Sequence, residues 1–454
     1  MSGREQFDAI VVGAGPAGEV VAGELADGGL KVAIVERERV AGECSFWACM
    51  PSKALLRPGH VLAEAQRIPG AAEAAAGQLD VERALAWRDK IVSNWDDSGY
   101  VTWLTDRGIE LIRGDGRLVG DGGVDVEDRR LQAEHIVIAT GSVPSIPPIE
   151  GLSETAFWTN REATGAHEIP KRLLIIGAGA VGVELSQAYA SFGASVALID
   201  AAPHILPGED AAVAEALSPV LRDEGVDIHT GTGIARVGGG ESERQVLLED
   251  GTELRGDALL VATGRKPNTA GLGLESLAVK LERGAIEVDA RLRAAPGIYA
   301  IGDASGVNLT THTGKYQARV CAAGILGNGY DADYRAIPRI AYTDPGVAGV
   351  GLTPAAARDQ GIAARVGTAN FGDTAASSLG RSDWRGAHSQ FLSLVADASG
   401  TIIGAYAVAP HAEDWFGQLI LAVQQRVTAE ELARTIQPFP AASEVITLAA
   451  RELL

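Results

Sequence analysis

Two cysteines lie close enough in the sequence to work as a redox pair. Cys44 and Cys49 are separated by four residues, and Cys321 is the third cysteine of the 454-residue chain. A chain this long with so few cysteines does not depend on disulfides for folding, so a close pair is more typical of a reactive dithiol than of a structural bridge. At the start of a helix, this spacing would bring both sulfurs within disulfide reach, and the helix dipole would lower the pKa of the nearer thiol. We favour this over the alternative of two buried small residues, which is the interpretation we give Cys321 in its alanine-rich stretch.

An internal repeat supplies elements that could bring electrons to the pair. Ala9 to Glu36 (AIVVGAGPAG…VAIVE) and Leu173 to Asp200 (LLIIGAGAVG…VALID) share one pattern. Each has an apolar run, a glycine-rich turn, an alanine-rich amphipathic stretch and a second apolar run that closes on a carboxylate, with the same spacing from first glycine to acid. The pattern predicts strand, turn, helix and strand, twice.

The glycines and the closing acid of each repeat match the demands of a dinucleotide. The first glycine permits a tight turn, the second lets a diphosphate approach the backbone, and the third allows close packing of the helix. These positions are Gly13, Gly15 and Gly18 in the first repeat and Gly177, Gly179 and Gly182 in the second. The helix N-terminus would hold the phosphates, and Glu36 or Asp200 would accept hydrogen bonds from a ribose. We therefore predict two dinucleotide sites rather than two plain glycine-rich turns.

The remaining patterns complete a three-domain organisation. Short apolar strands ending in Thr-Gly, at Val137 to Gly141 and Leu260 to Gly264, follow the two repeats, and a strand at Ile298 to Asp303 is expected to return to the first domain. From about residue 335 the chain alternates strands with helices, the latter expected at 412–434 and 444–454, as in an α+β domain. The predicted fold class is α/β, with two Rossmann-like dinucleotide-binding domains and a C-terminal α+β domain. The predicted boundaries are 1–150 with 271–335 for the first dinucleotide-binding domain, 151–270 for the second and 336–454 for the C-terminal domain.

Charge and hydropathy exclude several classes of partner. The formal net charge is -20, and the chain has no run rich in Lys or Arg, so we expect neither nucleic acid nor an anionic membrane surface to bind. Apolar stretches last only a few residues, against the roughly 20 that a membrane-spanning helix requires. The polar N-terminal stretch lacks the pattern of a secretory signal. These features predict a cytoplasmic enzyme without membrane insertion.

The motifs together resemble those of the pyridine nucleotide-disulfide oxidoreductases, the group of dihydrolipoyl dehydrogenase, glutathione reductase and mercuric reductase. The resemblance covers essentially the whole length. Its matching pieces are GAGPAG with Glu36, the Cys-x4-Cys pair followed by Pro-Ser-Lys, both ATG strands, GAGAVG with Glu184, and AIGD ending at Asp303.

This resemblance implies a set of cofactor contacts. FAD would bind the first site and NADH the second, with Asp303 contacting the ribitol. The ATG strands add Thr140, Gly141 and Gly264 to the nucleotide-binding positions, and Gly116 and Thr311 are weaker flavin contacts. Lys53 and Glu184 match an ion pair near the reactive nitrogen of the flavin, where a cation stabilises an electron-rich ring.

The resemblance also assigns roles to the cysteines and points to the nicotinamide cofactor. Cys49 would lie against the flavin as the charge-transfer thiolate, and Cys44 would be the interchange thiol. A carboxylate at Asp200 accepts from a 2′-hydroxyl and repels a 2′-phosphate, and Ala201 and Ala202 follow it where an Arg could have held that phosphate. NADH is therefore expected, with NADPH less favoured.

The chain departs from this family where a catalytic base should lie. The disulfide reductases carry a His-Pro-x-x-x-Glu pattern near the C-terminus, whereas Phe439 occupies the histidine position here. Phe cannot exchange a proton, so Glu444 is as much a helix-start residue as a catalytic one. Between the cysteines, Phe46, Trp47 and Ala48 could line an aromatic acceptor site or pack behind the pair.

These departures leave the small-molecule electron acceptor open. Cys44 could attack a small disulfide, or the enzyme could reduce a quinone, a dye or a metal ion. Mercury is disfavoured because no cysteine follows Cys321, and a flavin-binding sensor without turnover fits poorly with a complete electron path. The resemblance further implies a homodimer in which the segment around Glu444 completes the active site of the partner.

Overall fold

The computed structural model describes residues 4–120, 122–240, 243–380 and 390–454; residues 1–3 of the polar N-terminal stretch lie outside them. The chain forms two compact units. The first comprises Met1–Pro51, Arg88–Ser145 and Gly264–Asp333, and the second comprises Ser52–Trp87, Ile146–Thr263 and Tyr334–Leu454.

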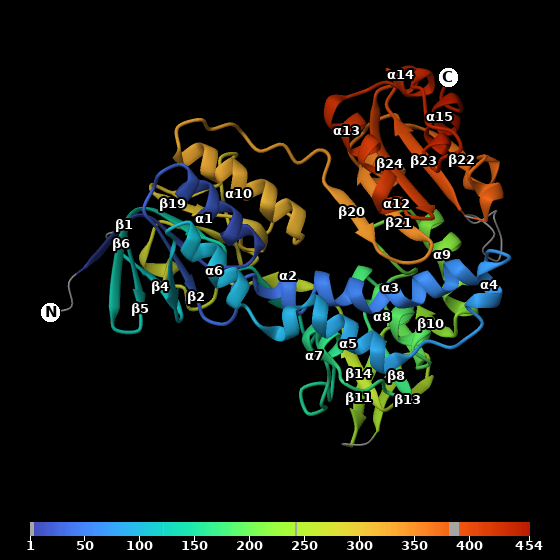
Figure 1. Cartoon of the computed structure of the whole chain (residues 1–454), viewed down its shortest axis with the longest axis horizontal. Helices are drawn as coiled ribbons and strands as arrows, with labels where there is room; N and C mark the ends of the chain where they lie inside the picture. Colours follow the sequence, from blue (N-terminus) through green and yellow to red (C-terminus); the bar gives the residue numbers. More distant parts are fainter. Residues whose placement is uncertain (1–3, 121, 241–242, 381–389) are drawn as a thin grey trace. The chain divides into compact units, whose positions relative to one another are not determined.

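The first unit is built on an eight-stranded sheet (Figure 1). Its main strand order is β18-β19-β6-β1-β2-β3, and the β4–β5 ribbon joins β6. The bounds are β1 Glu5–Val12, β2 Val32–Glu36, β3 Glu110–Arg113, β4 Gly116–Val119, β5 Gly123–Val126, β6 Arg129–Ile138, β18 Arg293–Ala295 and β19 Ile298–Ala300. β19 pairs in parallel with β6, which confirms that the strand beginning at Ile298 returns to the first sheet.

The central strand β1 is apolar on both faces, as in buried parallel sheets, so both faces need to be covered. Helices cover one of them. Ala9 and Val11 of β1 pack with residues of helices α1 (Pro16–Asp27) and α10 (Thr311–Ile325), whereas Ile10 and Val12 belong to the core on the opposite face. Figure 1 shows α1 and α10 side by side. Cys321 is fully buried in α10, as predicted for a packing residue.

The second unit contains the second repeat, in a four-stranded parallel sheet of order β10-β9-β8-β14. Its elements are β8 Arg172–Ile176, α8 Ala180–Ser191, β9 Ser195–Asp200, α9 Ala211–Asp223, β10 Val226–Thr230 and β14 Ala258–Val261. An antiparallel sheet of β11 (Ile234–Gly239), β12 (Arg244–Leu248) and β13 (Glu253–Gly256) follows. The predicted order of strand, turn, helix and strand is thus present in both repeats.

The C-terminal part of this unit is a five-stranded antiparallel sheet of order β20-β21-β24-β23-β22. The bounds are β20 Pro338–Ala341, β21 Gly346–Gly351, β22 Arg365–Asn370, β23 Phe391–Ala396 and β24 Ile402–Ala409. Residues of the four helices α12 (Ala412–Trp415), α13 (Gly417–Gln425), α14 (Ala429–Arg434) and α15 (Glu444–Arg451) pack against its residues in one core.

The expected continuous helix over 412–434 was wrong, because three helices occupy this stretch. Arg426 ends α13 in the left-handed conformation, and Thr428 starts α14 with a capping box to Glu431. These two features end one helix and begin the next, although the apolar pattern continues between them.

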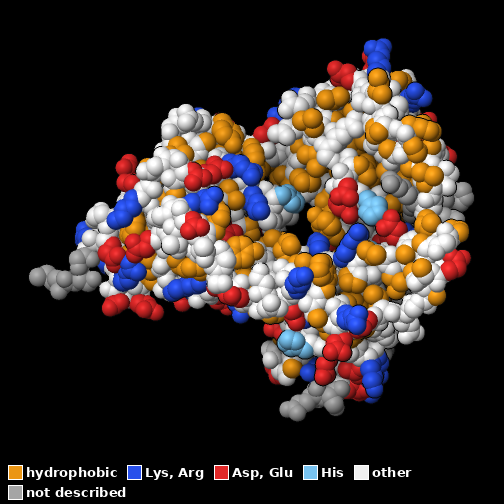
Figure 2. Space-filling view, in the orientation of Figure 1, with side chains coloured by type: hydrophobic (Ala, Val, Ile, Leu, Met, Phe, Trp, Pro, Cys, Tyr) orange, Lys and Arg blue, Asp and Glu red, His pale blue; other side chains and the backbone are white. Residues whose placement is uncertain are grey.

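None of the helices among the described residues has the length and apolar character needed to cross a membrane. On the face in Figure 2, acidic and basic side chains are interspersed.

Candidate active site

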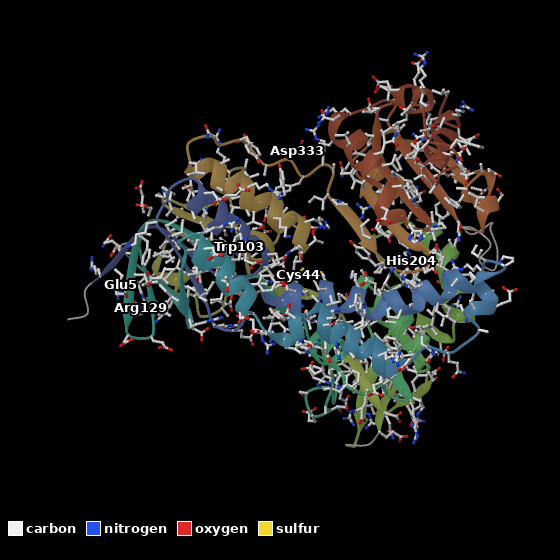
Figure 3. All side chains as sticks on the ribbon, in the orientation of Figure 1. Glu5, Cys44, Trp103, Arg129, His204 and Asp333 are labelled. Carbon is white, nitrogen blue, oxygen red and sulfur yellow. The ribbon has the colours of Figure 1, made fainter. Side chains whose placement is uncertain are left out.

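The cysteine pair lies in the first unit, where a short helix ends and a longer one begins. Cys44 (labelled in Figure 3) belongs to α2 (Gly42–Phe46), and Cys49 begins α3 (Cys49–Gln66). Both are free thiols, and Cys49 is close enough to Cys44 to raise the pKa of the Cys44 thiol. The Sγ atom of Cys49 lies 3.3 Å from Oγ1 of Thr311, the first residue of α10. The two cysteines are thus neighbours, and their function as a redox disulfide stays a prediction.

Close backbone packing holds α2 against the first glycine-rich turn. Gly42 has a φ of +57°, and a Cβ there would lie 2.9 Å from the Cα of Gly15. Glycine is needed at this position for both reasons, since other residues rarely adopt that φ and have no space for a side chain.

The surroundings of Cys44 oppose its ionisation and also contain groups that favour it. The hydrogen bond with Cys49, burial and the neighbouring thiol charge raise the pKa of the Cys44 thiol, whereas the Thr311 hydroxyl and the Lys315 cation act in the lowering direction. Lys315 follows Thr311 by one turn of α10, so both belong to the same side of that helix. Sequence reasoning missed Lys315, because nothing local connects it with residue 44.

The two aromatic residues between the cysteines are adjacent, with ring centroids 5.7 Å apart, but they differ in burial. Phe46 is buried in a small core with Ala41 and Val92, and its ring meets that of Tyr100 edge-on. Trp47 is only partly buried, and the guanidinium of Arg39 lies 5.2 Å from its ring centroid. For Phe46 the packing interpretation is therefore the one that the geometry supports.

The first glycine-rich turn has a backbone cradle suited to a diphosphate. A Cβ on Gly18 would lie 1.9 Å from the carbonyl oxygen of Gly13, which itself has a φ of +105°. Around the Cβ position of Gly15 there is open space within 4 Å. The carboxylate of Glu36 accepts hydrogen bonds from the amides of Ala14 and Glu38, at 2.8 and 2.7 Å, which fixes it beside the turn.

The second turn repeats this geometry. A Cβ on Gly182 would lie 1.8 Å from the carbonyl oxygen of Gly177, whose φ is +108°, and the Cβ position of Gly179 again faces open space. The carboxylate of Asp200 accepts from the amides of Ala178 and Ala202, at 2.6 and 2.8 Å. Each carboxylate oxygen retains capacity for a further hydrogen bond.

Asp303 lies in a polar network that the sequence did not reveal. Its Oδ2 accepts a 2.5 Å hydrogen bond from the Ser142 hydroxyl, which accepts one of 2.7 Å from the Arg265 guanidinium. Burial raises the pKa of Asp303, while Ser142 and Arg265 oppose that rise. Arg265 also lies 3.5 Å from Glu43, the residue before Cys44. The sole sequence signal for this network was the position of Arg265 directly after the second ATG strand.

The other nucleotide-binding candidates of the first unit lie at turns or close packing points. The Thr140 hydroxyl donates to the carbonyl of Asn268, at 2.7 Å. Gly141 and Gly264 have positive φ values of +71° and +105°. A Cβ on Gly116 would lie 3.0 Å from a methyl group of Val12.

In the second unit, Lys53 and Glu184 form a close ion pair. Nζ of Lys53, on α3, donates to Oε2 of Glu184, on α8, at 2.6 Å. The other carboxylate oxygen accepts from the backbone amide of Tyr342, at 3.0 Å, and the Lys53 ammonium lies 4.5 Å from the centre of the Tyr342 ring. Glu184 is buried, so these partners compensate a charge that would otherwise be costly. The prediction that these two residues pair is confirmed, and Tyr342 is a partner that the sequence did not indicate.

Glu444 and Phe439 lie in the C-terminal segment of the second unit. Glu444 is the first residue of α15 and accepts a 3.3 Å hydrogen bond from the amide of Ala441, as a helix-start residue does. Phe439 is 77% exposed and Ile436 is 95% exposed. Two large apolar side chains so exposed in one segment indicate a surface that a partner can cover.

Comparison with known proteins agrees with this geometry. Residues 7–322 match the family model of pyridine nucleotide-disulphide oxidoreductases, and residues 337–450 match the dimerisation domain of the same family. The chain is 37% identical to the dihydrolipoyl dehydrogenase of Thermus scotoductus, over 98% of this chain and 97% of that protein. It is 32% identical to a mercuric reductase of Acidithiobacillus ferrooxidans, over 98% of this chain and 82% of that protein.

A solved structure has the same fold over nearly the whole chain. The Cu(II) complex of the HOCl-induced flavoprotein disulfide reductase RclA from Escherichia coli superposes with a TM-score of 0.87 at 27% identity, covering 98% of this chain and 99% of that one. Together with the family matches, this establishes the mixed α/β architecture and the type of enzyme. The chain belongs to the pyridine nucleotide-disulphide oxidoreductases and is an FAD-dependent enzyme of that family.

Proposed function

We propose that this enzyme transfers electrons from NADH through FAD to the Cys44–Cys49 pair and then to a small disulfide. The observation that carries the proposal is the contact between the two thiols, with Cys49 against Thr311 at the start of α10. We also propose the domain division 1–150 with 271–335, 151–270 and 336–454. The few cysteines support a cytoplasmic location.

The two glycine-rich turns fit the two nucleotides. At Gly15 and Gly179 the space that a side chain would fill is open, as a diphosphate approaching the backbone requires. Glu36 and Asp200 are held beside these turns by backbone amides, with capacity left for ribose hydroxyls. FAD bound at the first turn would supply two-electron redox chemistry between the nicotinamide and the cysteine pair. Besides Asp303 and Thr311, the residues that we assign to the nucleotides are Gly13, Gly18, Gly116, Thr140, Gly141, Gly177, Gly182 and Gly264.

The dithiol chemistry can be written with the residues of this chain. The Cys44 thiolate attacks one sulfur of the acceptor disulfide, and the other acceptor sulfur leaves as a thiolate that takes up a proton. Cys49 then attacks Cys44, which releases the second acceptor thiol and forms the enzyme disulfide. Lys315 supports this sequence because its positive charge acts against the rise in the pKa of the Cys44 thiol that Cys49 and burial cause. Lys53, held by Glu184, is assigned to the flavin environment.

NADH is the proposed donor because of the residues around the second closing acid. Asp200 is fixed by the amides of Ala178 and Ala202, and the positions after it are alanines. The Asp200 carboxylate would repel a 2′-phosphate, and the alanines at 201 and 202 provide no guanidinium to bind it.

A homodimer is the proposed assembly, and the dimerisation domain of residues 337–450 supports it. Phe439 and Ile436 are the exposed apolar residues that a second copy would cover. In that arrangement, Phe439 and Glu444 would complete the active site of the partner, with an aromatic ring where the family has an imidazole.

A second candidate function is reduction of a quinone, a dye or a metal ion. Phe439 favours this because electron transfer to such acceptors needs no base for a thiol leaving group. RclA, which shares the fold, has been solved as a Cu(II) complex, so Cu(II) is a reasonable metal acceptor to include.

An anaerobic titration with NADH tests the electron path. Reduction should produce a long-wavelength absorption band from the Cys49 thiolate to the flavin, and Cys49→Ser should abolish it. Cys321→Ser, which alters the third cysteine in its buried position, is the matched control and should keep the band. A wild-type enzyme without the band would contradict the dithiol assignment.

Acceptor screening then separates the two candidates. Under the disulfide proposal, Cys44→Ser abolishes turnover of lipoamide or glutathione disulfide, and Phe439→His raises it about tenfold or more, since a positioned base contributes roughly 10²-fold to 10⁴-fold. Turnover of quinones or Cu(II) that survives Cys44→Ser would instead establish direct transfer from the flavin. A Phe439→His variant without any gain would show that the acceptor is not a disulfide of this kind.

A further inference from the structure

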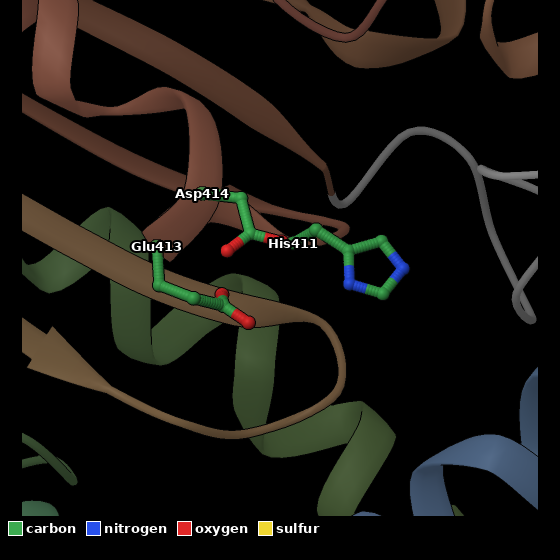
Figure 4. A group of neighbouring side chains, drawn as sticks. All are labelled: His411, Glu413 and Asp414. Atoms are coloured by element: carbon green, nitrogen blue, oxygen red, sulfur yellow. The ribbon is translucent and has the colours of Figure 1, made fainter.

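A histidine and two carboxylates lie close together in the second unit, outside the residues assigned to electron transfer. His411, Glu413 and Asp414 follow strand β24, and one potential ligand atom from each lies within 4.8 Å of the others. Figure 4 shows the imidazole and both carboxylates around this turn.

The environment of Glu413 suits a cation that would bind its carboxylate. Its Oε2 atom is fully buried and has no hydrogen-bond partner among the described residues. The atom lies beside Gly346, where a Cβ would come within 2.8 Å of it, so a glycine leaves room for the carboxylate. A buried carboxylate oxygen without a partner destabilises the fold, and a bound cation removes that cost.

A cavity of about 120 Å³ adjoins this cluster and is lined by both His411 and Glu413. Glu64 of α3 also lines it, with Oε1 3.5 Å from Nε2 of His411. Two cations of the cavity wall are engaged elsewhere, Arg67 with Asp344 and Lys53 with Glu184. Arg57 and His60 also line the cavity, and space remains next to Glu413.

The backbone holds His411 in an unusual conformation. Its φ is +48° and its ψ +39°, in the left-handed region, which is uncommon for residues other than glycine although histidine, asparagine and aspartate are enriched there. Such a conformation persists where the surrounding structure determines it, and it is more frequent at binding sites.

We propose that His411, Glu413 and Asp414 bind a divalent transition-metal ion of the Zn²⁺ or Cu²⁺ type. An imidazole nitrogen with carboxylate oxygens suits these ions better than Mg²⁺ or Ca²⁺, which prefer oxygen alone. The adjoining cavity provides room for water ligands, and Glu64 lies where it can join the set. The site goes beyond the proposed function and does not depend on it.

Equilibrium dialysis with Zn²⁺ alone tests the proposal. The FAD-loaded Cys44→Ser/Cys49→Ser protein is used so that the thiols cannot bind the ion. We expect one ion per chain, with Mg²⁺ failing to compete. Glu413→Gln and His411→Asn should each weaken binding at least about tenfold, because even residues behind metal ligands typically contribute 10-fold to 100-fold. Asparagine is chosen at 411 because it tolerates the left-handed conformation.

The control is Asp227→Asn, which disrupts another histidine–carboxylate pair, 2.8 Å apart with His229, and should leave Zn²⁺ binding unchanged. With Cu²⁺ as the probe, the electron paramagnetic resonance spectrum should show coupling to one imidazole nitrogen, lost in His411→Asn. Retained flavin and an unchanged circular dichroism spectrum show that each variant is folded.

Three results would overturn the proposal: no bound Zn²⁺, equal competition by Mg²⁺, or variants that bind as tightly as the parent protein. None of these measurements uses NADH, so failure of the metal site and failure of the electron path are distinguishable.

Discussion

The two glycine-rich turns have nearly the same backbone but different side chains around it. In both, a Cβ added to the third glycine would lie under 2 Å from the carbonyl oxygen of the first glycine. The closing acid of each accepts hydrogen bonds from two backbone amides. The repeat therefore fixes the strand, the turn and the start of the helix. What each turn binds must depend on the residues that differ.

The difference is clearest in the first helical turn. Helix α1 carries Glu19 there, whereas α8 carries no acidic residue in its first turn. An anion at a helix N-terminus is repelled by a carboxylate, but burial raises the pKa of Glu19 to about 8, with Lys315 acting in the opposite direction. The first turn thus contains a carboxyl group that is mostly neutral at pH 7. A neutral carboxyl group is compatible with phosphate binding.

The largest expected effect comes from a methyl group at the third glycine of either turn. Gly18→Ala should abolish FAD binding and give a colourless protein, whereas Gly182→Ala should keep FAD and weaken NADH binding by about 100-fold. Both Cβ atoms would overlap a carbonyl oxygen, and relieving such an overlap costs about 3 kcal/mol. Flavin absorbance and NADH titration measure the two outcomes.

Gly15→Ala and Gly179→Ala are the matched controls, because their methyl groups meet no atom within 4 Å in the protein. They should leave the free energy of unfolding of the ligand-free protein unchanged. They should still lower the affinity for the corresponding nucleotide. Loss of FAD in Gly182→Ala would show that the two turns are not assigned as we propose.

A smaller effect is expected from the residues after the second closing acid. Asp200→Ser combined with Ala201→Arg should shift the ratio of kcat/KM for NADPH over NADH by about 100-fold, since it removes a repelling carboxylate and adds a phosphate-binding fork. Rates of flavin reduction with each nucleotide measure the ratio. Ala201→Arg alone should shift it less, because Asp200 still accepts from Ala178 and Ala202. An unchanged ratio in the double variant would contradict our assignment of the donor.

The same comparison shows what the sequence could predict. Glycines, a strand and a closing acid are local signals, so both turns, their strands and the contact between Cys44 and Cys49 followed from patterns within one segment. The pairing of Lys53 with Glu184 was available only through the family resemblance.

The hydrogen-bond networks around these elements could not be predicted from the sequence, because they join segments that are distant in it. Asp303 meets Ser142 from 161 residues away, and Arg265 reaches the same hydroxyl from 123 residues away. Phe46 could be buried or lining a site, and only the packing of Val92 and Tyr100 against it decided between the two. In the C-terminal part, the apolar period ran through Arg426, where the backbone turns left-handed.

The smallest effect concerns Glu19 and the dependence of FAD affinity on pH. Bound phosphate raises the pKa of a neighbouring carboxyl group further, so FAD binds the protonated form of Glu19 more tightly. Affinity for FAD should therefore be constant below pH 8 and fall as the pH rises above about 8, by at most about tenfold per pH unit. Glu19→Gln should remove that fall, since its amide stays neutral. Reconstitution of the apoprotein with FAD between pH 6 and 10 measures it.

Glu24→Gln, on the same helix but paired with Arg319 at the surface, is the control and should titrate like the wild type. A wild-type affinity that does not change above pH 8 would mean that the charge on Glu19 is not felt at the first turn, and the two turns would then differ in sequence but not in electrostatics.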